Sequence, residues 1–580
     1  MLAAIRELGK YVSKGTVEEK VDIEGKVLTI VFDNYDFSFK GIEIEDFDSL
    51  KIERYLYDNK KGNNSKAIKR IYKKSSQDEQ YKEITKDLGI IKSFFNGVLK
   101  LEKAQNNISF IKGIIKIINQ EEVLRSIAEK INDFNKKDLI YLTLKSSDGK
   151  YPGDYSFLKD ANDNKSIEKY KKTASTGAKC SLCLEDKEVS GINDIFTFYT
   201  IDKPGFISGG FDKKDAWKNY PTCAECRDLL KKGKSFMMSE LKFQFYDLNY
   251  FLIPKLVIND NKVLSEVIDI ISQTKKKISL KKQVVRRLTD DEEEVLYNLS
   301  EQNDQISFNF LFLKINSNNN AERILLSLED VFPSRLRAIF KAKEDVDEIF
   351  GRDFNFGRLR KFFKKSDDLK RNNDLDSFFL EIVNDIFMNK KIELSFLSKF
   401  FMLRISKEFI ESRDNFSNFL NTVNDAMMDV LFLEKLKLIK SEEAKLVENS
   451  IFNDLFARYG PTLNTPVKRG IFLLGSLTQM LLNKQKDDRG STPFIKKLKN
   501  LKMTQSDIKF LLPAVQNKFI EYDSFGFGKR KLAAEISKLL LSDDNWKMPV
   551  QEINFYFACG MNLYKEVGNI LYEDKENEEV

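Results

Sequence analysis

Apolar side chains follow two different periods along the first part of the chain, and each period predicts a different kind of element. Over residues 1–14 they recur at every third or fourth position, which predicts a short helix. Over 21–57 apolar and polar residues alternate, which predicts strands, with turns at 24–25 and 40–41, where glycine occurs. Helical spacing returns over 84–135. Further strands are expected at 139–144, 241–246, 250–257, 308–315 and 324–328, with a helix at 262–273.

The last third of the chain has the helical period almost throughout, which predicts an all-α bundle. Before it, residues 352–376 are rich in charge and asparagine, as in an exposed linker or hinge. We therefore expect a multidomain α+β protein. Its mixed α/β domain would span 1–360, with a cysteine-containing insertion at 175–235, and its helical domain would span 375–580. The expected C-terminal helices are 377–389, 394–440, 442–457, 467–484, 504–521, 530–541 and 551–567.

Composition limits the kind of protein. With 580 residues, of which 42% are hydrophobic, the chain can bury more than one core. It has no apolar run of the roughly 18–20 residues that span a bilayer and no signal-like N-terminus, so we expect a cytoplasmic protein that does not contact a membrane. The chain contains no histidine. This excludes Ser-His-Asp and Cys-His nucleophile systems, and every zinc site that needs histidine.

Four of the five cysteines form two close pairs, Cys180 with Cys183 and Cys223 with Cys226, and 39 residues separate the pairs. A two-residue gap lets both sulfurs of a pair reach one metal ion, and two pairs complete the tetrahedral Cys₄ shell that zinc prefers. Four protein ligands leave no open coordination position, so we expect one structural Zn²⁺ per chain. A redox dithiol and four unrelated buried thiols are the competing interpretations. Cys559 is expected to be a buried apolar residue.

The 39 residues between the pairs are expected to form a strand, a glycine-rich loop and a return. Glycine lets the backbone approach a ligand closely, and the two phenylalanines of the loop could wedge or stack. The GGFD sequence resembles the GGDD motif of palm polymerases but lacks its second carboxylate, and a plain surface turn is the commoner alternative. The candidate nucleic-acid contacts here are Lys203, Phe206, Gly209, Gly210, Phe211, Lys213 and Lys214.

Three stretches are strongly basic. Residues 60–74 and 275–287 contain no acidic residue, and 352–371 has eight basic residues against three acidic ones. Such clusters can neutralise phosphates, although any single one is as often a solvated surface. The acidic string 290–294 is expected to be a solvated charge partner. Asn63, Asn64 and Lys66 are candidates for reading base edges. The other candidate contacts are Lys69, Arg70, Lys73, Lys275, Lys276, Lys277, Lys281, Lys282, Arg286 and Arg287.

Several segments in order resemble a known family. CSLC, FTFYTIDKPGFISGGF, AWKNYPTCAECRDLLKKGKSF and LKFQFYDLNYFLIPKL are similar to the zinc-containing large subunit of type I-B CRISPR Cascade, the Csh-type family. KRGIFLLGSLTQMLLNKQ, STPFIKKLKNL and INFYFACGMNL resemble the closing helical domain of that family. The resemblance covers about residues 175–258 and 467–564.

This resemblance implies a non-enzymatic DNA-binding subunit of a crRNA-guided complex. In such complexes the large subunit recognises the protospacer-adjacent motif on duplex DNA, supports R-loop formation and recruits a separate helicase-nuclease, while guide pairing reads the remaining sequence. The implied partners are crRNA, target double-stranded DNA, and the Cascade backbone and crRNA-processing subunits. The helical domain resembles the Cascade small subunit, which some relatives also make from an internal start codon. Met427 and Met428 are candidates for that start, with ordinary core methionines as the alternative.

Two other interpretations stay open. One is a metal-dependent nuclease or polymerase-like enzyme, against which the missing histidines and the incomplete GGDD motif argue. The other is a free-standing zinc-ribbon protein that binds nucleic acid without a guide RNA.

Overall fold

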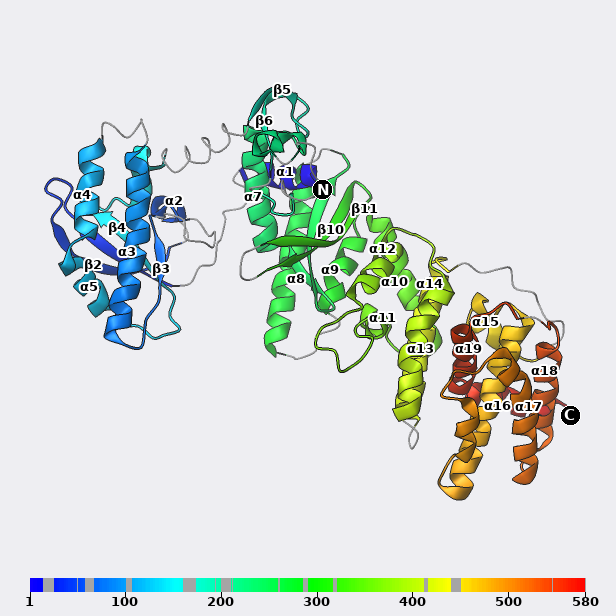
Figure 1. Ribbon diagram of the computed structural model, residues 1–580. Coiled ribbons are helices and arrows are strands. Elements are labelled where there is room, and N and C mark those ends of the chain that lie inside the picture. Colours follow the sequence, from blue (N-terminus) through cyan, green and yellow to red (C-terminus); the bar gives the residue numbers. More distant parts are fainter. Residues whose placement is uncertain are drawn as a thin grey trace. The chain divides into compact units, whose positions relative to one another are not determined.

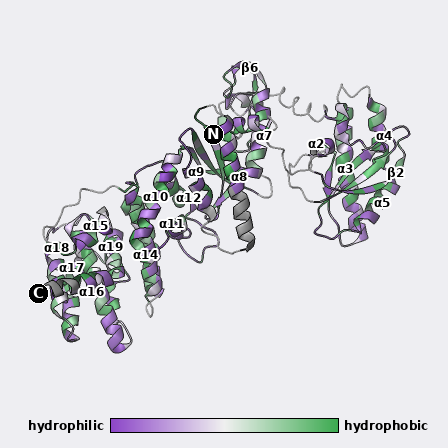
Figure 2. Cartoon of the chain, turned by 180° about the vertical axis from the view of Figure 1, so that it is seen from behind, coloured by the Kyte–Doolittle hydropathy of each residue, from purple (hydrophilic) through white to green (hydrophobic). Residues whose placement is uncertain are grey.

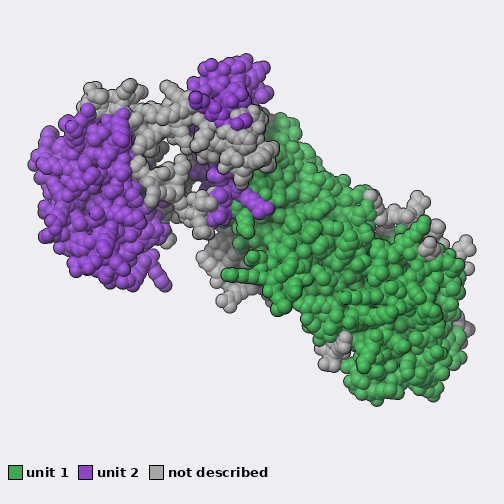
Figure 3. Space-filling view, viewed as in Figure 1, with its two compact units in different colours: residues 1, 241–314, 324–580 green, residues 2–240, 315–323 purple. Residues whose placement is uncertain are grey.

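A computed structural model describes the chain over residues 1–13, 25–48, 51–57, 67–100, 107–159, 174–192, 195–199, 210, 212–258, 261–284, 291–316, 321–411, 416–439, 450–544 and 546–578. Helices predominate over three small sheets, which confirms the expected α+β class (Figure 1). By its contacts the chain divides into two compact units (Figure 3). Unit 1 contains Met1, 241–314 and 324–580, and unit 2 contains 2–240 and 315–323. The domain boundary expected between 360 and 375 stays a prediction.

Unit 2 contains a four-stranded sheet in the order β2-β1-β4-β3. β1 pairs parallel with β4 and antiparallel with β2. The helices α3, α4 and α5 bury their apolar residues in one core with β1 and β4, as their sequence period predicts. The bounds are β1 (Lys26–Phe32), β2 (Phe39–Asp46), α2 (Ile52–Tyr55), β3 (Lys69–Ile71), α3 (Gln77–Leu99), α4 (Ile108–Ile118), α5 (Glu121–Ile131) and β4 (Ile140–Ser146).

The predicted turn at 40–41 is wrong, because both residues lie inside β2. The register between β1 and β2 shifts there, so that Val31 is opposite Gly41 and Phe32 is opposite Phe39. Gly41 has φ +133°, a conformation that favours glycine. The glycine therefore marks a β-bulge, and the actual turn lies at residues 34–36.

Two helices from distant parts of the sequence cross closely in unit 2. These are α1 (Leu2–Ser13) and α7 (Ala224–Glu240). A Cβ atom on Gly9 would lie 1.9 Å from the Leu229 carbonyl oxygen, and one on Gly233 would lie 1.9 Å from the Ile5 carbonyl oxygen. The two backbones are thus in direct contact, which only glycine at these positions permits.

Unit 1 contains an antiparallel sheet in the order β11-β10-β9-β8. Its aromatic side chains pack on helices that follow in sequence: the ring centroids of Phe245 and Phe356 are 5.3 Å apart, and those of Phe310 and Phe387 are 5.1 Å apart. The bounds are β8 (Lys242–Phe245), β9 (Leu248–Leu256), α8 (Asn261–Val284), α9 (Asp291–Ser300), β10 (Ile306–Ile315), β11 (Glu322–Val331), α10 (Pro333–Phe350), α11 (Phe356–Phe362) and α12 (Asp376–Phe387).

The expected exposed linker over 352–376 is wrong in its first half, whereas residues 366–374 are largely exposed and lie outside helices and strands. Its first half contains α11, and Phe354, Phe356, Leu359 and Phe362 are buried. Asn355, Arg358, Arg360 and Lys361 lie between these buried positions, so composition concealed the apolar pattern of α11.

The rest of unit 1 is helical, as the sequence predicts, and Figure 2 shows both hydrophilic and hydrophobic residues along its helices. α16 begins where the Thr465 hydroxyl accepts a hydrogen bond from the Lys468 N–H, and it ends at Gly490, which has φ +67°. It crosses α19 closely, because a Cβ atom on Gly560 would lie 1.7 Å from the Phe472 carbonyl oxygen. The bounds are α13 (Leu394–Glu411), α14 (Ser417–Lys435), α15 (Asn453–Arg458), α16 (Pro466–Arg489), α17 (Gln505–Glu521), α18 (Phe527–Leu540), α19 (Val550–Asn562) and α20 (Tyr564–Glu578).

Two methionines proposed as an internal start, Met427 and Met428, lie in the middle of α14 and are buried. No helix in the described part of the chain is long and apolar enough to cross a membrane.

Candidate metal centre

The first cysteine pair lies at the turn between two short strands of unit 2, β5 (Ser175–Lys179) and β6 (Asp186–Ser190). The Leu184 N–H donates to the Cys180 carbonyl at 2.9 Å, and the Cys180 N–H donates to the Glu185 carbonyl at 3.0 Å. Leu184 has φ +63°, the left-handed conformation of a tight turn. This turn places the Cys180 and Cys183 side chains on the same side, as a metal knuckle requires.

The second pair lies where the chain passes from a strand into a helix. Cys223 ends β7 (Thr222–Cys223), which pairs with β6, and Cys226 lies in the first turn of α7. The unpaired N–H groups and the dipole at a helix N-terminus stabilise thiolates. The Cys223 N–H itself donates to the Cys180 sulfur at 3.3 Å, so the second pair also supports the first.

The four sulfur atoms converge on one point. All lie within 4.8 Å of one another, and the Cys183 and Cys223 sulfurs are 3.8 Å apart. With Zn–S bonds of about 2.3 Å, a tetrahedral Cys₄ shell has sulfurs about 3.8 Å apart. Cys180, Cys223 and Cys226 are buried and Cys183 is partly exposed. The sequence-predicted ligands therefore form one cluster that could hold a metal ion.

The thiol pKa values differ within the cluster. Burial raises the pKa of Cys223 and Cys226. Burial acts in the same direction on Cys180, but hydrogen bonds from the backbone N–H groups of Cys183, Cys223 and Leu182 outweigh it and lower the pKa of Cys180 to about 7. Backbone donors aimed at a buried sulfur are the environment of a thiolate that ligates a metal.

The segment around the cluster is fastened to other parts of unit 2. Arg6 on α1 donates to the Leu182 carbonyl inside the first knuckle, and Arg227 on α7 donates to the Gly191 carbonyl that follows β6. Glu322 accepts a 3.0 Å hydrogen bond from the Thr197 N–H and forms an ion pair with Lys234 on α7. The cluster thus ties the two ends of the insertion to α7, which itself packs on α1.

The predicted strand after β6 is wrong, because residues 195–199 form turns. Here the hydrogen bonds between Thr197 and Glu322 satisfy backbone groups that a strand would have paired with a neighbour. Of the glycine-rich loop the structure describes Gly210, which has φ +61°, and the exposed Lys214 in the 3₁₀-helix η4 (Lys213–Lys218). Lys203, Phe206, Gly209 and Phe211 lie outside the described residues, and the side chain of Lys213 is likewise not described.

The first basic stretch is described only in part. Asn63, Asn64 and Lys66 lie outside the described residues, while Lys69 and Arg70 belong to β3. The Arg70 guanidinium lies 4.9 Å from the centroid of the Tyr72 ring. Lys73 donates to the Asn132 carbonyl at 2.8 Å and to the Phe134 carbonyl, so this lysine contacts the chain itself.

The second basic stretch continues α8, which includes Lys275, Lys276, Lys277, Lys281 and Lys282, whereas Arg286 and Arg287 lie outside the described residues. The acidic string that follows is not wholly solvated. Glu293 is buried, where it accepts hydrogen bonds from the Phe356 N–H at 2.9 Å and from the Tyr246 hydroxyl, and it pairs with Lys343. The helical period of α9 turns this carboxylate inward.

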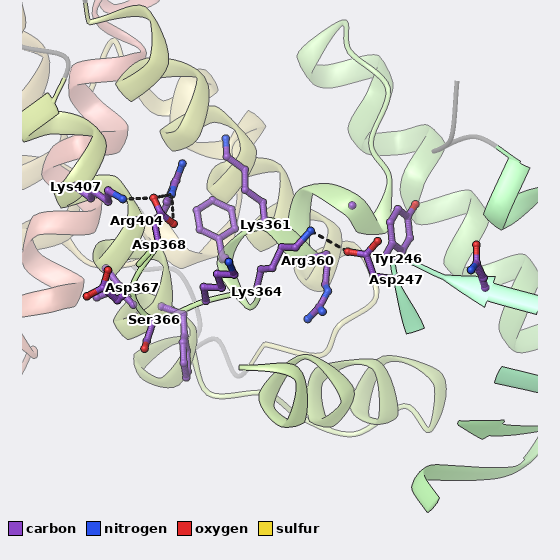
Figure 4. Close-up of a pocket in the computed structure, with 16 residues that line it drawn as sticks. Tyr246, Asp247, Arg360, Lys361, Lys364, Ser366, Asp367, Asp368, Arg404 and Lys407 are labelled. Atoms are coloured by element: carbon purple, nitrogen blue, oxygen red, sulfur yellow. Dashed lines mark hydrogen bonds and ion pairs between the residues drawn. The ribbon is translucent and has the colours of Figure 1, made fainter. Parts of the chain in front are cut away.

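Sequence reasoning missed a basic pocket in unit 1 (Figure 4). The third basic stretch, which includes Lys361, Lys364 and Lys365, forms only one of its walls. The second wall is the β8–β9 turn, which lies more than a hundred residues before this stretch in the sequence. The third wall is α13, about forty residues after it. The signal that could have found it is the basic pair Arg404 and Lys407, one turn apart on a predicted helix.

Comparison with protein families gives three matches that follow one another along the chain. The N-terminal, central and C-terminal domains of the CRISPR-associated protein TM1802 (cas_TM1802) match residues 1–161, 177–331 and 354–575. The central match contains all four clustered cysteines. A comparison with curated proteins finds no match. Because the three domains occur in order over nearly the whole chain, the protein belongs to the CRISPR-associated TM1802 family and has a role in a CRISPR system.

Proposed function

We propose that the chain is the large subunit of a type I-B Cascade, a crRNA-guided surveillance complex of the cytoplasm. The observation that carries this proposal is the match of all three domains of one CRISPR-associated family, in order, to a single chain. In this role the protein binds target double-stranded DNA, recognises the protospacer-adjacent motif, supports R-loop formation and recruits the helicase-nuclease. Its partners are crRNA, the Cascade backbone and crRNA-processing subunits, and a small subunit, for which an internal start at Met427 or Met428 is one source.

The metal of this proposal is one structural Zn²⁺ per chain, held by Cys180, Cys183, Cys223 and Cys226. Four thiolates suit zinc and fill its coordination shell, so the ion binds no substrate and no water. Its contribution is to hold the knuckle turn, β7 and the start of α7 together, because the ligands come from all three. The glycine-rich loop between the pairs is then presented from a fixed base, and we assign contacts with DNA to this loop and to the basic stretches.

The protein acts by binding and not by catalysis in this proposal. The absence of histidine removes the residue that most often serves as a general base, and all four clustered thiols are used as metal ligands. The energy of replacing a DNA duplex by an RNA–DNA hybrid is nearly balanced, so binding contacts alone can favour the opened state.

Co-expression with the neighbouring CRISPR genes and a crRNA array tests this function. A tagged chain is expected to co-purify with crRNA and with the other subunits, and the purified chain is expected to show no Mg²⁺-dependent cleavage of single- or double-stranded DNA. A chain that elutes alone from a sizing column after co-expression would favour the free-standing binding protein. Robust cleavage that one carboxylate substitution abolishes would favour the nuclease.

A further inference from the structure

The basic pocket of unit 1 has a volume of about 500 Å³ and three walls. One wall is the β8–β9 turn with Tyr246 and Asp247, another is α11 with the loop that follows it, and the third is α13 (Figure 4). A volume of this size lies within the range of ligand-binding pockets, which is about 300–1,000 Å³. The pocket lies wholly within unit 1, and none of its lining residues belongs to the cysteine cluster.

The cations of the pocket fall into two groups. The first group supports the fold: Arg360, which is 4% exposed, bonds Asp376 and the Phe363 carbonyl, and Lys361 bonds Asp425 at 3.0 Å. These partners lie behind the pocket wall and are not among its lining residues. The second group faces the opening and consists of Lys364, Lys365, Arg404 and Lys407.

Three cations of the second group form ion pairs with four carboxylates. Lys364 pairs with Asp247 at 2.8 Å, and both side chains are about half exposed, at 49% and 60%. Asp368 pairs with Lys407 and, at 3.2 Å, with Arg404. Within α13, Arg404 also pairs with Glu408 at 2.7 Å, and Lys407 pairs with Glu411 at 3.7 Å. In Figure 4 the pairs of Asp247 and of Asp368 lie on different sides of the pocket. Ion pairs as exposed as those of Asp247 and Asp368 add little net stability, so an incoming anion can replace these two carboxylates without unfolding the protein.

Lys365 completes the group. No hydrogen bond or ion pair connects its ammonium group to the residues that the structure describes, although its side chain is only partly exposed. Among the described residues, Lys365 is therefore the cation of this group without a partner. Lys364 has one exposed partner, and Arg404 and Lys407 share the exposed Asp368 and each also pair with a glutamate of α13. Displacement of the exposed Asp247 and Asp368 would leave Lys364, Lys407 and Arg404 facing an incoming anion beside Lys365, while Glu408 and Glu411 stay paired along α13 and Asp367 remains in the lining.

The wall beside these cations is apolar. Leu403 is 46% exposed, and Phe400, one helical turn before Arg404, is held by the rings of Phe363 and Phe378 at centroid distances of 4.7 and 5.0 Å. Phosphate-binding cations next to an ordered aromatic and aliphatic surface are the arrangement with which proteins bind single strands of nucleic acid. A concave pocket closed on three sides admits one extended strand and does not admit the width of a duplex.

We propose that this pocket binds the sugar–phosphate backbone of a single-stranded nucleic acid, with successive phosphates on Lys364, Lys365, Arg404 and Lys407 and a base against Leu403 and Phe400. The inference rests on the proposed function, in which duplex opening and guide binding both present unpaired strands. Asp247 and Asp368 occupy the phosphate positions until the strand binds.

Binding of a labelled oligothymidylate to the full chain, followed by fluorescence anisotropy at several salt concentrations, tests the proposal. The double variant Lys364→Ala/Lys365→Ala is expected to lose roughly tenfold in affinity at low salt, because two phosphate contacts are removed. The slope of log affinity against log salt should become shallower by about 1.4, since each contact with a single strand contributes about 0.7.

The matched control is Lys496→Ala/Lys497→Ala. It also removes two positive charges, from two consecutive lysines that are exposed in unit 1 and do not line the pocket. Its affinity is expected to stay within about twofold of the unmodified chain, as for exposed charges away from a binding site. Equal losses of affinity in the two double variants would show a general effect of positive charge and would contradict binding in the pocket.

Asp247→Asn and Asp368→Asn provide the sharper test, because they should strengthen binding. Each removes an internal competitor and keeps the shape of the side chain, so affinity should rise roughly threefold to tenfold. A damaged fold would not produce such a gain, and unchanged or weaker binding in both variants would contradict the proposal.

Further arms of the experiment separate the sources of the strand. Oligouridylate against oligothymidylate shows whether RNA or DNA is preferred, and duplex DNA should be insensitive to the pocket variants. If the unmodified chain binds no single strand but co-purifies with crRNA, the proposed binding site is wrong and the proposed function stands. If the chain binds single strands through the pocket but does not co-purify with crRNA, the binding site stands and the proposed function is wrong.

Discussion

The metal centre and the basic pocket are two sites of opposite construction in one chain. The cysteines lie close together in two short motifs, are mostly buried, and contact one another. The cations that face the pocket opening come from the loop after α11 and from α13. They are partly exposed, and they contact exposed carboxylates, one of which lies in the β8–β9 turn. Substitution at a closed centre should cost stability, whereas substitution at an open pocket should cost binding. Two substitutions, one in each site, test this difference, and a third at a helix crossing outside both sites gives the scale of a packing defect.

The largest effect is expected from Cys223→Ser. A bound structural zinc supplies about 10–16 kcal/mol of folding free energy in small zinc domains, so loss of one thiolate should release the metal and loosen the surrounding segment. Metal analysis should fall from one zinc per chain to none. Hydrogen exchange should become faster over β6 and α7 and stay unchanged over α16 and α19.

Cys559→Ala is the control for this substitution. Cys559 is a buried cysteine in α19 of unit 1 and does not belong to the cluster of four cysteines. It should keep one zinc per chain. An unchanged zinc content in Cys223→Ser would show that Cys223 is not a metal ligand.

The next largest effect is expected from Gly560→Ala, which involves neither site. The new methyl group would lie 1.7 Å from the Phe472 carbonyl oxygen, so α16 and α19 must move apart, at a cost of about 3 kcal/mol. Chemical denaturation measures this loss. Gly568→Ala on α20 is the matched control, since its nearest neighbour is at 3.7 Å and alanine favours the helix by up to about 1 kcal/mol. Equal stability of the two variants would contradict the close crossing.

The smallest effect on stability is expected from Asp368→Asn in the pocket. Its ion pairs are exposed, so the free energy of unfolding should change by about 1 kcal/mol or less. The same denaturation measurement applies. A loss as large as that of Gly560→Ala would mean that the pocket pairs hold the fold, and the contrast between the two sites would disappear.

The two sites also differ in how far the sequence predicts them. Two Cys-x-x-Cys motifs identify the cysteine cluster that could hold a metal ion, because each pair is local in the sequence. Folding has to bring together only the two pairs, across the long gap between them. The pocket depends on which turn meets which helix, and nothing in the spacing of Asp247, Lys364 and Arg404 indicates that they meet. Tertiary contacts decide such sites, and a single sequence records them only indirectly.

The same distinction applies to the fold. The helical period correctly predicts α1, α16, α17 and α18, because one amphipathic face is enough to define each of them, whereas the single helix predicted at 551–567 is divided into α19 and α20. Local composition fails at Gly41, where glycine forms a bulge, and at α11, where charged residues surround buried aromatic ones. In both places the packing of distant residues determines the conformation.

The exchangeable pairs of the pocket have a consequence for kinetics. Because Asp247 holds Lys364 and Asp368 holds Lys407 and Arg404 before a strand arrives, binding would replace one partner by another and need little further ordering of these side chains. The same carboxylates can retake their cations one at a time, so a bound strand can be released stepwise. A strand held in this way can advance through the pocket by one nucleotide at a time while it stays attached, which a site of buried and permanent contacts would not allow.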